Sequence, residues 1–128
     1  DVYKRQHIGL VFWCGAYKKP REITWMLGVG LFLTTLGLAF TGYLLPWNQE
    51  AYWATMVGTA IPGYTPIIGN LIVSLLRSGD ALTGETISRF YSIHMLLLPG
   101  ALIGLLVWHL AMTVKQGVSF LTEEWLDG

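Results

Sequence analysis

Histidines are the residues of this sequence whose type and position best suit chemistry. His94 and His109 lie fifteen residues apart in a stretch without Asp, Glu, Lys or Arg, and His7 opens another short apolar stretch. Polar side chains at membrane depth are costly and tend to serve a function, and imidazole is the commonest protein ligand for metals. A single histidine in an apolar helix more often bonds a neighbouring helix, and this alternative stays open for each one alone. Three of them together favour a metal-ligand role.

The spacing of His94 and His109 assigns them to two different sites. In a helix, fifteen residues correspond to a rise of roughly 22 Å, so the two side chains cannot share one ion. They also lie roughly 60° apart around the helix axis. Pro99 lies between them and can kink the helix, which would let both face the interior of one bundle. We therefore expect two sites at two depths.

Glycines at a matching spacing occur earlier in the chain. Gly28 and Gly42 are fourteen residues apart, a rise of about 21 Å, and nearly in register around a helix. Glycine admits a flat group or another helix close to the backbone. Helix packing is the alternative explanation, and we expect it for Gly30, Gly37 and Gly104. Two glycines spaced like two histidines favour two planar cofactors in a four-helix bundle, for which histidine-bound haem is the candidate.

The residues around these positions predict membrane helices. Hydrophobic residues make up 53% of the 128 residues and charged residues 12%, whereas soluble domains average about 25% charged. Stretches without charge cover 23–49, 51–76 and 90–114. About 20 apolar residues cross a bilayer, so we expect the first and third to be transmembrane helices. The net charge of zero gives no indication of nucleic-acid binding, and the single cysteine, Cys14, excludes an internal disulfide or a multi-cysteine metal site.

The middle stretch contains repeated helix breakers. They are Pro62, Gly63, Pro66 and Gly69. We expect two short helices, 51–60 and roughly 66–78, that lie at the membrane surface, with a third full span as the alternative. Aromatic residues here suit an interface; they are Tyr52, Trp53 and Tyr64.

The ends of the chain suggest a piece of a longer protein. Residues 7–17 fit the end of a helix, and we expect residues 1–6 to be a non-native or truncated lead-in. We expect 7–118 to form one partial transmembrane domain and the acidic residues 119–128 to be a loop or surface segment. No signal peptide is apparent.

Basic residues predict the orientation. Lys18, Lys19 and Arg21 precede the first predicted span and Lys115 follows the second. Two spans separate these clusters, so both lie on one side, which the positive-inside rule makes cytoplasmic. The 47–89 connection then lies on the opposite side.

Several motifs resemble the cytochrome b subunit of bc-type quinol-oxidising complexes. They are GAYKKPREITW, FTGYLLPWNQEAYWA, IPGYTPIIG, SRFYSIHMLLLP and WHLAMTVKQG, and they extend in that order over residues 7 to about 118. Within the family, KKPRE, RFYS before His94, and KQG look most like the short cytochrome b6 form. The fifteen-residue gap agrees, since the mitochondrial form typically has one residue fewer.

The resemblance implies an all-α membrane protein that is part of a haem-binding transmembrane four-helix bundle. The chain would hold the end of the second helix, the complete third and fourth helices, and short surface helices between them. His7 and His109 would together ligate the iron of the high-potential b-type haem. His94 would ligate the iron of the low-potential haem, whose second histidine would lie upstream and is absent from this chain. Gly28 and Gly42 would admit the haem edges.

The resemblance also implies roles for residues outside the haem ligands. Arg89 would support the local fold or the haem pocket. Tyr52, Trp53, Ala54 and Ile68 would line the quinol-oxidation pocket, with Ala54 standing where the mitochondrial form has glycine. No residue resembles a nucleophile or a paired general acid and base, so no catalytic residue is predicted.

The implied function is electron transfer within a quinol–cytochrome c or plastocyanin reductase. Two bis-histidine b-type haems would carry electrons across the membrane between a quinol-oxidising and a quinone-reducing site, with quinone as a further bound molecule. The implied partners are an iron–sulfur protein, a c-type cytochrome, membrane quinol, the lipid bilayer, and the C-terminal half of cytochrome b or a separate subunit IV-like chain, in a dimeric complex. A bacterial plasma membrane is expected, with a thylakoid-type membrane as the alternative.

Two other functions are compatible with histidines in apolar helices. One is the two-haem membrane anchor of another dehydrogenase. Such an anchor would not explain the PW and IPG motifs of the connection between the two spans. The other is a cofactor-free transporter fragment, in which histidines would relay protons.

Overall fold

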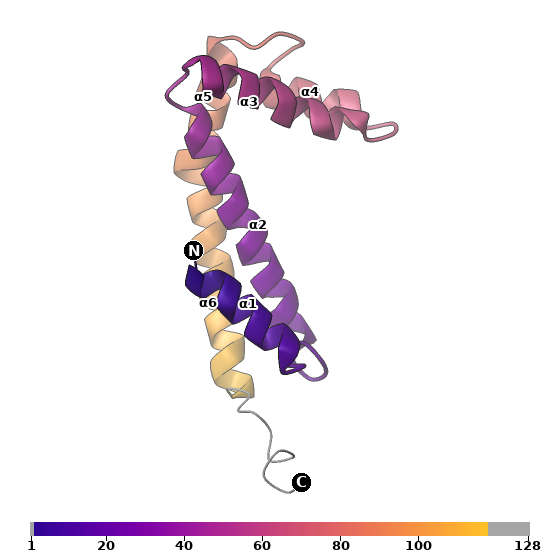
Figure 1. Cartoon of the computed structure of the whole chain (residues 1–128), viewed down its shortest axis with the longest axis vertical. Helices are drawn as coiled ribbons and strands as arrows, with labels where there is room; N and C mark the ends of the chain where they lie inside the picture. Colours follow the sequence, from indigo (N-terminus) through magenta and orange to yellow (C-terminus); the bar gives the residue numbers. More distant parts are fainter. Residues whose placement is uncertain (1, 118–128) are drawn as a thin grey trace, which may run out of the picture. The chain divides into compact units, whose positions relative to one another are not determined.

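The computed structural model describes residues 2–117, and within that range every regular element is helical (Figure 1). This confirms the all-α prediction. The chain divides into two compact units, which we describe separately: one comprises the residues up to Leu33 and from Ile103 onward, and the other is Thr34–Leu102. The elements are α1 (Val2–Trp13), α2 (Glu22–Leu44), α3 (Gln49–Ala60), the 3₁₀ turn η1 (Ile61–Tyr64), α4 (Gly69–Arg77), α5 (Gly84–Ser92), the π-helical turn η2 (Ile93–Leu97) and α6 (Leu98–Gln116). The segment predicted at 119–128 lies outside the described residues.

Helix α1 ends earlier than the sequence predicts. Gly15 adopts a left-handed backbone with a φ of 65°. The N–H of Gly15 bonds the Phe12 carbonyl at 3.1 Å, and the N–H of Ala16 bonds the Val11 carbonyl at 3.0 Å. This pair of bonds is the glycine-terminated Schellman cap, so the helix stops at Trp13 and not at residue 17. Residues 2–6 are helical as well, while their non-native origin stays a prediction.

Two helices are long and apolar enough to cross a membrane. One is α2, and the other is the continuous helix Gly84–Gln116 formed by α5, η2 and α6. A helix of sufficient length therefore lies at each predicted span, and the second begins six residues earlier than the uncharged stretch at 90–114. Its start has a local cause, because the Thr83 backbone N–H donates to the Thr86 hydroxyl at 3.0 Å, one half of a capping box.

The continuous helix contains a π-helical turn at His94. The Leu98 N–H bonds the Ile93 carbonyl, five residues back. Pro99 has no N–H, so the α-helical bond to the carbonyl four residues before it cannot form. The irregularity expected at Pro99 thus appears as a wider turn that begins before it. Such turns occur frequently at functional sites.

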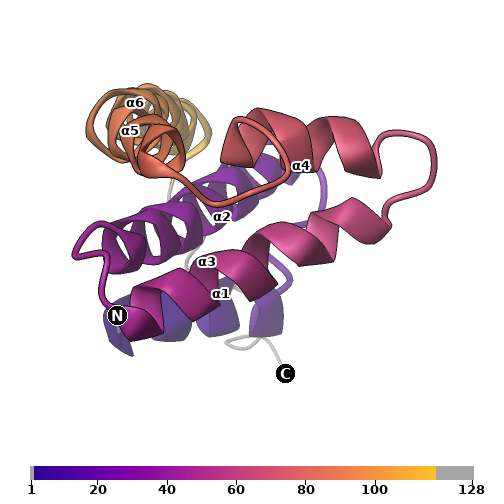
Figure 2. The same ribbon diagram turned by 90° about the horizontal axis from the view of Figure 1, so that it is seen from above.

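Helices α3 and α4 double back on each other, as Figure 2 shows. They are 12 and 9 residues long, which corresponds to about 18 Å and 14 Å, well short of the roughly 30 Å hydrocarbon core. The alternative of a third span is therefore wrong, and the two predicted short helices are present. A side chain at Gly69 would collide with the Gly63 backbone, so the reversal requires glycine there.

The core of the second unit is unusually polar. Arg77 is 9% exposed, and its guanidinium donates to the Thr59 hydroxyl at 2.7 Å, the Met56 carbonyl at 3.0 Å and the Asp80 carbonyl at 3.3 Å. The Thr86 hydroxyl donates to the Arg77 carbonyl at 2.6 Å. These bonds tie the end of α4 to α3 and to the start of α5.

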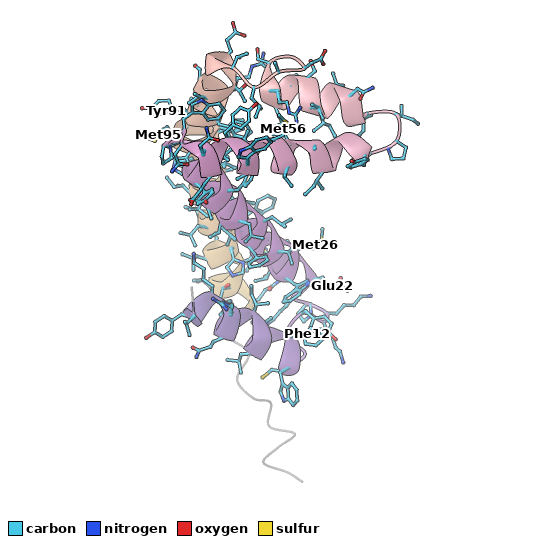
Figure 3. All side chains as sticks on the ribbon, turned by 45° about the horizontal axis from the view of Figure 1, so that its top comes forward. Phe12, Glu22, Met26, Met56, Tyr91 and Met95 are labelled. Atoms are coloured by element: carbon cyan, nitrogen blue, oxygen red, sulfur yellow. The ribbon has the colours of Figure 1, made fainter. Side chains whose placement is uncertain are left out.

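In the first unit, aromatic rings join the end of α1 to the start of α2. The Tyr17 ring stacks on Phe12 with centroids 5.5 Å apart and lies 5.7 Å from the Trp25 ring. Large apolar side chains nevertheless remain outward: Met26 is 70% exposed and Phe12 62% (Figure 3). Such apolar outer surfaces suit lipid or further helices.

Candidate functional site

The His94 ring in the second unit is held by Thr41 of α2. The Thr41 hydroxyl lies 2.9 Å from His94 Nδ1 and 2.8 Å from the Gly37 carbonyl oxygen. A hydroxyl has one hydrogen to donate, and a carbonyl can only accept. Thr41 therefore donates to Gly37 and accepts from the N–H at His94 Nδ1. This hydrogen bonding leaves His94 Nε2 as the free lone pair.

Gly42 faces the same ring. A Cβ at Gly42 would lie 2.8 Å from His94 Cε1, closer than real side-chain contacts allow. Among the described residues the group opposite Gly42 is the imidazole, and the entry of a haem edge at Gly42 stays a prediction. Glycine here makes room for the histidine ring.

The first unit repeats this arrangement at His109. His109 Nδ1 lies 3.1 Å from the Thr24 carbonyl oxygen, so the hydrogen sits on Nδ1 and Nε2 is again the free lone pair. A Cβ at Gly28 would lie 3.3 Å from His109 Cε1. In both cases a histidine donates its Nδ1 hydrogen to α2, which is the usual support of a metal-ligating histidine.

His7 of α1 is the second histidine of the first unit. Its ring centroid lies 6.5 Å from that of His109, and the ring planes are 84° apart. Two imidazoles on opposite sides of one metal ion, with metal–nitrogen bonds of about 2.0 Å, have centroids about 6.3 Å apart. Rotation about a metal–nitrogen bond leaves the plane angle unrestricted. The separation of His7 and His109 therefore fits two imidazoles that would hold one ion.

The described residues offer no alternative metal cage. No group of three or more His, Cys, Asp or Glu side chains in residues 2–117 could hold an ion. A site at His7 and His109 would thus need its other ligands from a bound group, as haem supplies from its macrocycle. The other histidines of residues 2–117 are His7 and His109. Because these two lie together in the first unit, the described residues offer His94 no histidine partner.

The remaining glycines divide into two kinds. Gly30 faces the Leu105 side chain and Gly37 faces the Leu98 side chain, each with a would-be Cβ contact of 3.5 Å. These are ordinary packing distances, as expected for helix contacts. Gly104 meets nothing within 4 Å, so the packing expected for it is not formed by the described residues.

Arg89 donates from Nη1 to the Leu75 carbonyl in the last turn of α4. Arg89 was expected to support either the local fold or the haem pocket. The bond to α4 is a contact of the first kind. Cys14 is partly buried.

The residues expected to line a quinol pocket lie on and after α3. Tyr52 meets two rings edge-on, those of Trp47 at 5.9 Å and Trp53 at 5.3 Å. Trp53 is 58% and Ile68 48% exposed, and Ala54 is half-buried. Their pocket role stays a prediction.

Sequence reasoning missed Thr41, Thr24 and Arg77. Thr41 could have been recognised from the sequence. It is a polar residue at membrane depth in an apolar helix, and it precedes Gly42, which was expected to face a ligand. Thr24 acts on His109 through its backbone carbonyl, so its side chain gives no signal. Arg77 follows the uncharged stretch 51–76, and nothing in the neighbouring sequence indicates its bonds to α3.

The long apolar helices and the supported histidines together define a class: an all-helical membrane protein that presents imidazole nitrogens as ligands. Comparison with known proteins agrees. The family model described as cytochrome b(N-terminal)/b6/petB matches residues 5–124, and the chain belongs to this family. The resemblance inferred from the motifs is thereby confirmed, including its b6-like character, and the chain is part of an integral membrane protein.

Relatives of this chain come from two groups of electron-transport proteins. It is 49% identical over 114 residues to the menaquinol:cytochrome c reductase cytochrome b subunit of Bacillus subtilis, and 47% identical over 114 residues to that of Geobacillus thermodenitrificans. It is 42% identical over 113 residues to cytochrome b6 of a Synechocystis species. Each alignment covers 88% of this chain and 51% of the relative. The chain therefore spans about half the length of these curated relatives. Membership of this family excludes the two alternative functions, the membrane anchor of another dehydrogenase and the cofactor-free transporter.

Proposed function

We propose that this chain is the haem-binding part of the electron-transfer subunit of a quinol:cytochrome reductase of the bc/b6f type. The observation that carries the proposal is the 6.5 Å separation of the His7 and His109 rings, together with the hydrogen bond that leaves His109 Nε2 free. His7 and His109 would hold one b-type haem. His94 would hold a second, with its partner supplied from outside this chain.

The chain's own residues would position and protect these groups. A bound haem supplies a one-electron couple, and two imidazoles close its coordination sphere. Thr41 and the Thr24 carbonyl hold the hydrogens of His94 and His109 on Nδ1. Gly28 and Gly42 let both rings lie against α2.

The wider function follows from family membership. The relatives' names support quinol as the electron donor and a c-type cytochrome as an acceptor. We propose that electrons cross the membrane through two haems between a quinol-oxidising and a quinone-reducing site. The partners would be an iron–sulfur protein, a c-type cytochrome and the remaining half of cytochrome b or a subunit IV-like chain. The KKPRE loop would lie on the cytoplasmic side.

Replacing the histidines one at a time in the full-length subunit tests this proposal. His109→Ala and His7→Ala should each abolish the same haem, and His94→Ala should abolish the other, because each haem would be held by two imidazole nitrogens. The measurement is the reduced-minus-oxidised absorption of the purified complex, in which each variant should lose about half of the b-type alpha band. Met95→Leu, beside His94 but 56% exposed, is the control and should retain both haems. Absence of a b-type band from the parent protein, or different haems lost by His7→Ala and His109→Ala, would contradict the proposal.

A further inference from the structure

We propose that Thr41 is a positioning residue that tunes the redox potential of the haem bound by His94, and that no side chain of residues 2–117 has this role at His109. This inference rests on the proposed function. It arises from a difference between the two histidines: the acceptor for His94 is a side-chain hydroxyl, whereas the acceptor for His109 is a backbone carbonyl.

The Thr41 hydroxyl is the middle of a two-bond chain. His94 Nδ1–H donates to Thr41, and Thr41 donates to the Gly37 carbonyl, over 2.9 Å and 2.8 Å. Thr41 is only 5% exposed, so water does not compete for these bonds. Consecutive hydrogen bonds polarise one another, so the bond to Gly37 makes the hydroxyl a better acceptor for His94.

The chain of bonds has an electronic consequence at His94 Nε2. A histidine that donates its Nδ1 hydrogen to a good acceptor becomes a more basic ligand. A more basic axial ligand stabilises the higher charge of ferric iron over ferrous iron, which lowers the reduction potential. Loss of the hydroxyl should therefore raise the potential of the His94 haem.

Thr41 also fixes the direction of the ring. Gly42 leaves the imidazole against the backbone of α2, and the hydroxyl of the preceding residue then holds its rotation. Valine has nearly the shape of threonine but cannot accept a hydrogen bond. Thr41→Val thus removes the acceptor without opening a cavity.

The chain contains a matched control at the other histidine. The Thr113 hydroxyl bonds the His109 backbone carbonyl at 2.9 Å, one turn along α6. Thr113→Val makes the same chemical change beside a histidine, but at a hydroxyl that bonds the backbone and not the ring.

The test is a redox titration of the full-length subunit in its assembled complex. Thr41→Val should shift the reduction equilibrium of the His94 haem towards the reduced form by up to about tenfold, or about 59 mV for one electron, and should leave the His109 haem unchanged. Thr41→Ser, which keeps the hydroxyl, should restore the parent potential. Thr113→Val should alter neither haem. The low-spin ferric EPR signal of the His94 haem should also move in Thr41→Val, because the ring is free to rotate.

The outcomes separate this inference from the proposed function. An unchanged potential in Thr41→Val, equal shifts of both haems, or a Thr41→Ser variant that behaves like valine would overturn the role of Thr41. Should Thr41→Val fail to retain haem, Thr41→Cys replaces it, since sulfur accepts only weakly; a smaller shift in the same direction supports the inference and no shift overturns it. Absence of haem from the parent protein would instead overturn the proposed function.

Discussion

At the scale of single residues, the histidine sites depend on how closely an imidazole can approach α2. The two glycines opposite the rings differ in this respect. A Cβ at Gly42 would lie 2.8 Å from the His94 ring, whereas one at Gly28 would lie 3.3 Å from the His109 ring. The first distance requires the ring to move, while the second requires only a small adjustment. The His94 site should therefore be the less tolerant of the two.

Alanine substitution tests this difference. Gly42→Ala should displace the His94 ring and weaken binding of its haem by roughly tenfold or more, the scale on which misplaced ligands reduce affinity. Gly28→Ala should have a smaller effect on the other haem. The measurement is the retained b-type absorbance of the full-length subunit in the purified complex after competition with apomyoglobin. Gly37→Ala, which would meet Leu98 at an ordinary 3.5 Å, is the control on the same helix. A greater loss in Gly28→Ala than in Gly42→Ala would contradict this account.

At the scale of elements, the π-helical turn and the Arg77 bonds shape the second unit. A π-helical turn holds one residue more than an α-helical turn because its hydrogen bonds join residues five apart. The extra residue between His94 and His109, relative to the mitochondrial spacing, can therefore be accommodated locally at His94. Arg77 bonds α3 at the Thr59 hydroxyl and the Met56 carbonyl and bonds the loop after α4 at the Asp80 carbonyl, and these three acceptors are neutral.

Replacing Arg77 should loosen the connection between α4 and α5. Arg77→Leu removes the guanidinium's bonds to the Thr59 hydroxyl and to the Met56 and Asp80 carbonyls, and each lost hydrogen bond costs about 0.5–1.5 kcal/mol. Local opening should become at least about tenfold more frequent, which limited proteolysis of the 78–83 loop in native membranes would detect. Arg77→Lys should recover only part of the loss, because lysine lacks the planar fork. Ser92→Ala, which removes an exposed bond within α5, should leave the cleavage rate unchanged. A parent-like rate in Arg77→Leu would show that these bonds do not secure the loop.

At the scale of the whole molecule, the exposed apolar surfaces show what the chain needs around it. Helices α1 and α6 have no buried residue among those described, and Val107 and Trp108 of α6 are 63% and 57% exposed. In water such surfaces would be costly, whereas lipid and neighbouring helices would cover them. We expect two crossings, by α2 and by Gly84–Gln116, which would return the chain to the side from which it started.

Cysteine labelling tests that topology. With Cys14 and other accessible cysteines removed, Lys18→Cys and Lys115→Cys should react with an impermeant maleimide from the same side of the membrane. Asp80→Cys should react from the opposite side, since one crossing separates it from each of them. Membrane vesicles of both orientations, prepared from cells with the full-length subunit, provide the measurement. Labelling of Lys18→Cys and Asp80→Cys from one side would rule out the two-crossing arrangement.

Features that depend on local composition were predictable from the residues alone. Uncharged stretches of sufficient length predicted both membrane helices, and prolines and glycines predicted the break into α3 and α4. Motifs around these elements were specific enough to indicate the family. Element ends were predicted less well, because the cap at Gly15 and the start at Thr83 depend on particular backbone bonds.

Which groups meet depends on how the helices pack. Thr41 and His94 are 53 residues apart in the sequence, and Thr24 and His109 are 85 apart. No local pattern specifies such pairs, because a hydrogen-bond partner depends on which faces of two helices come together and on their relative height. The sequence therefore determined which residues could act as ligands. The packing against α2 decided which nitrogen of His94 and of His109 is left free to bind.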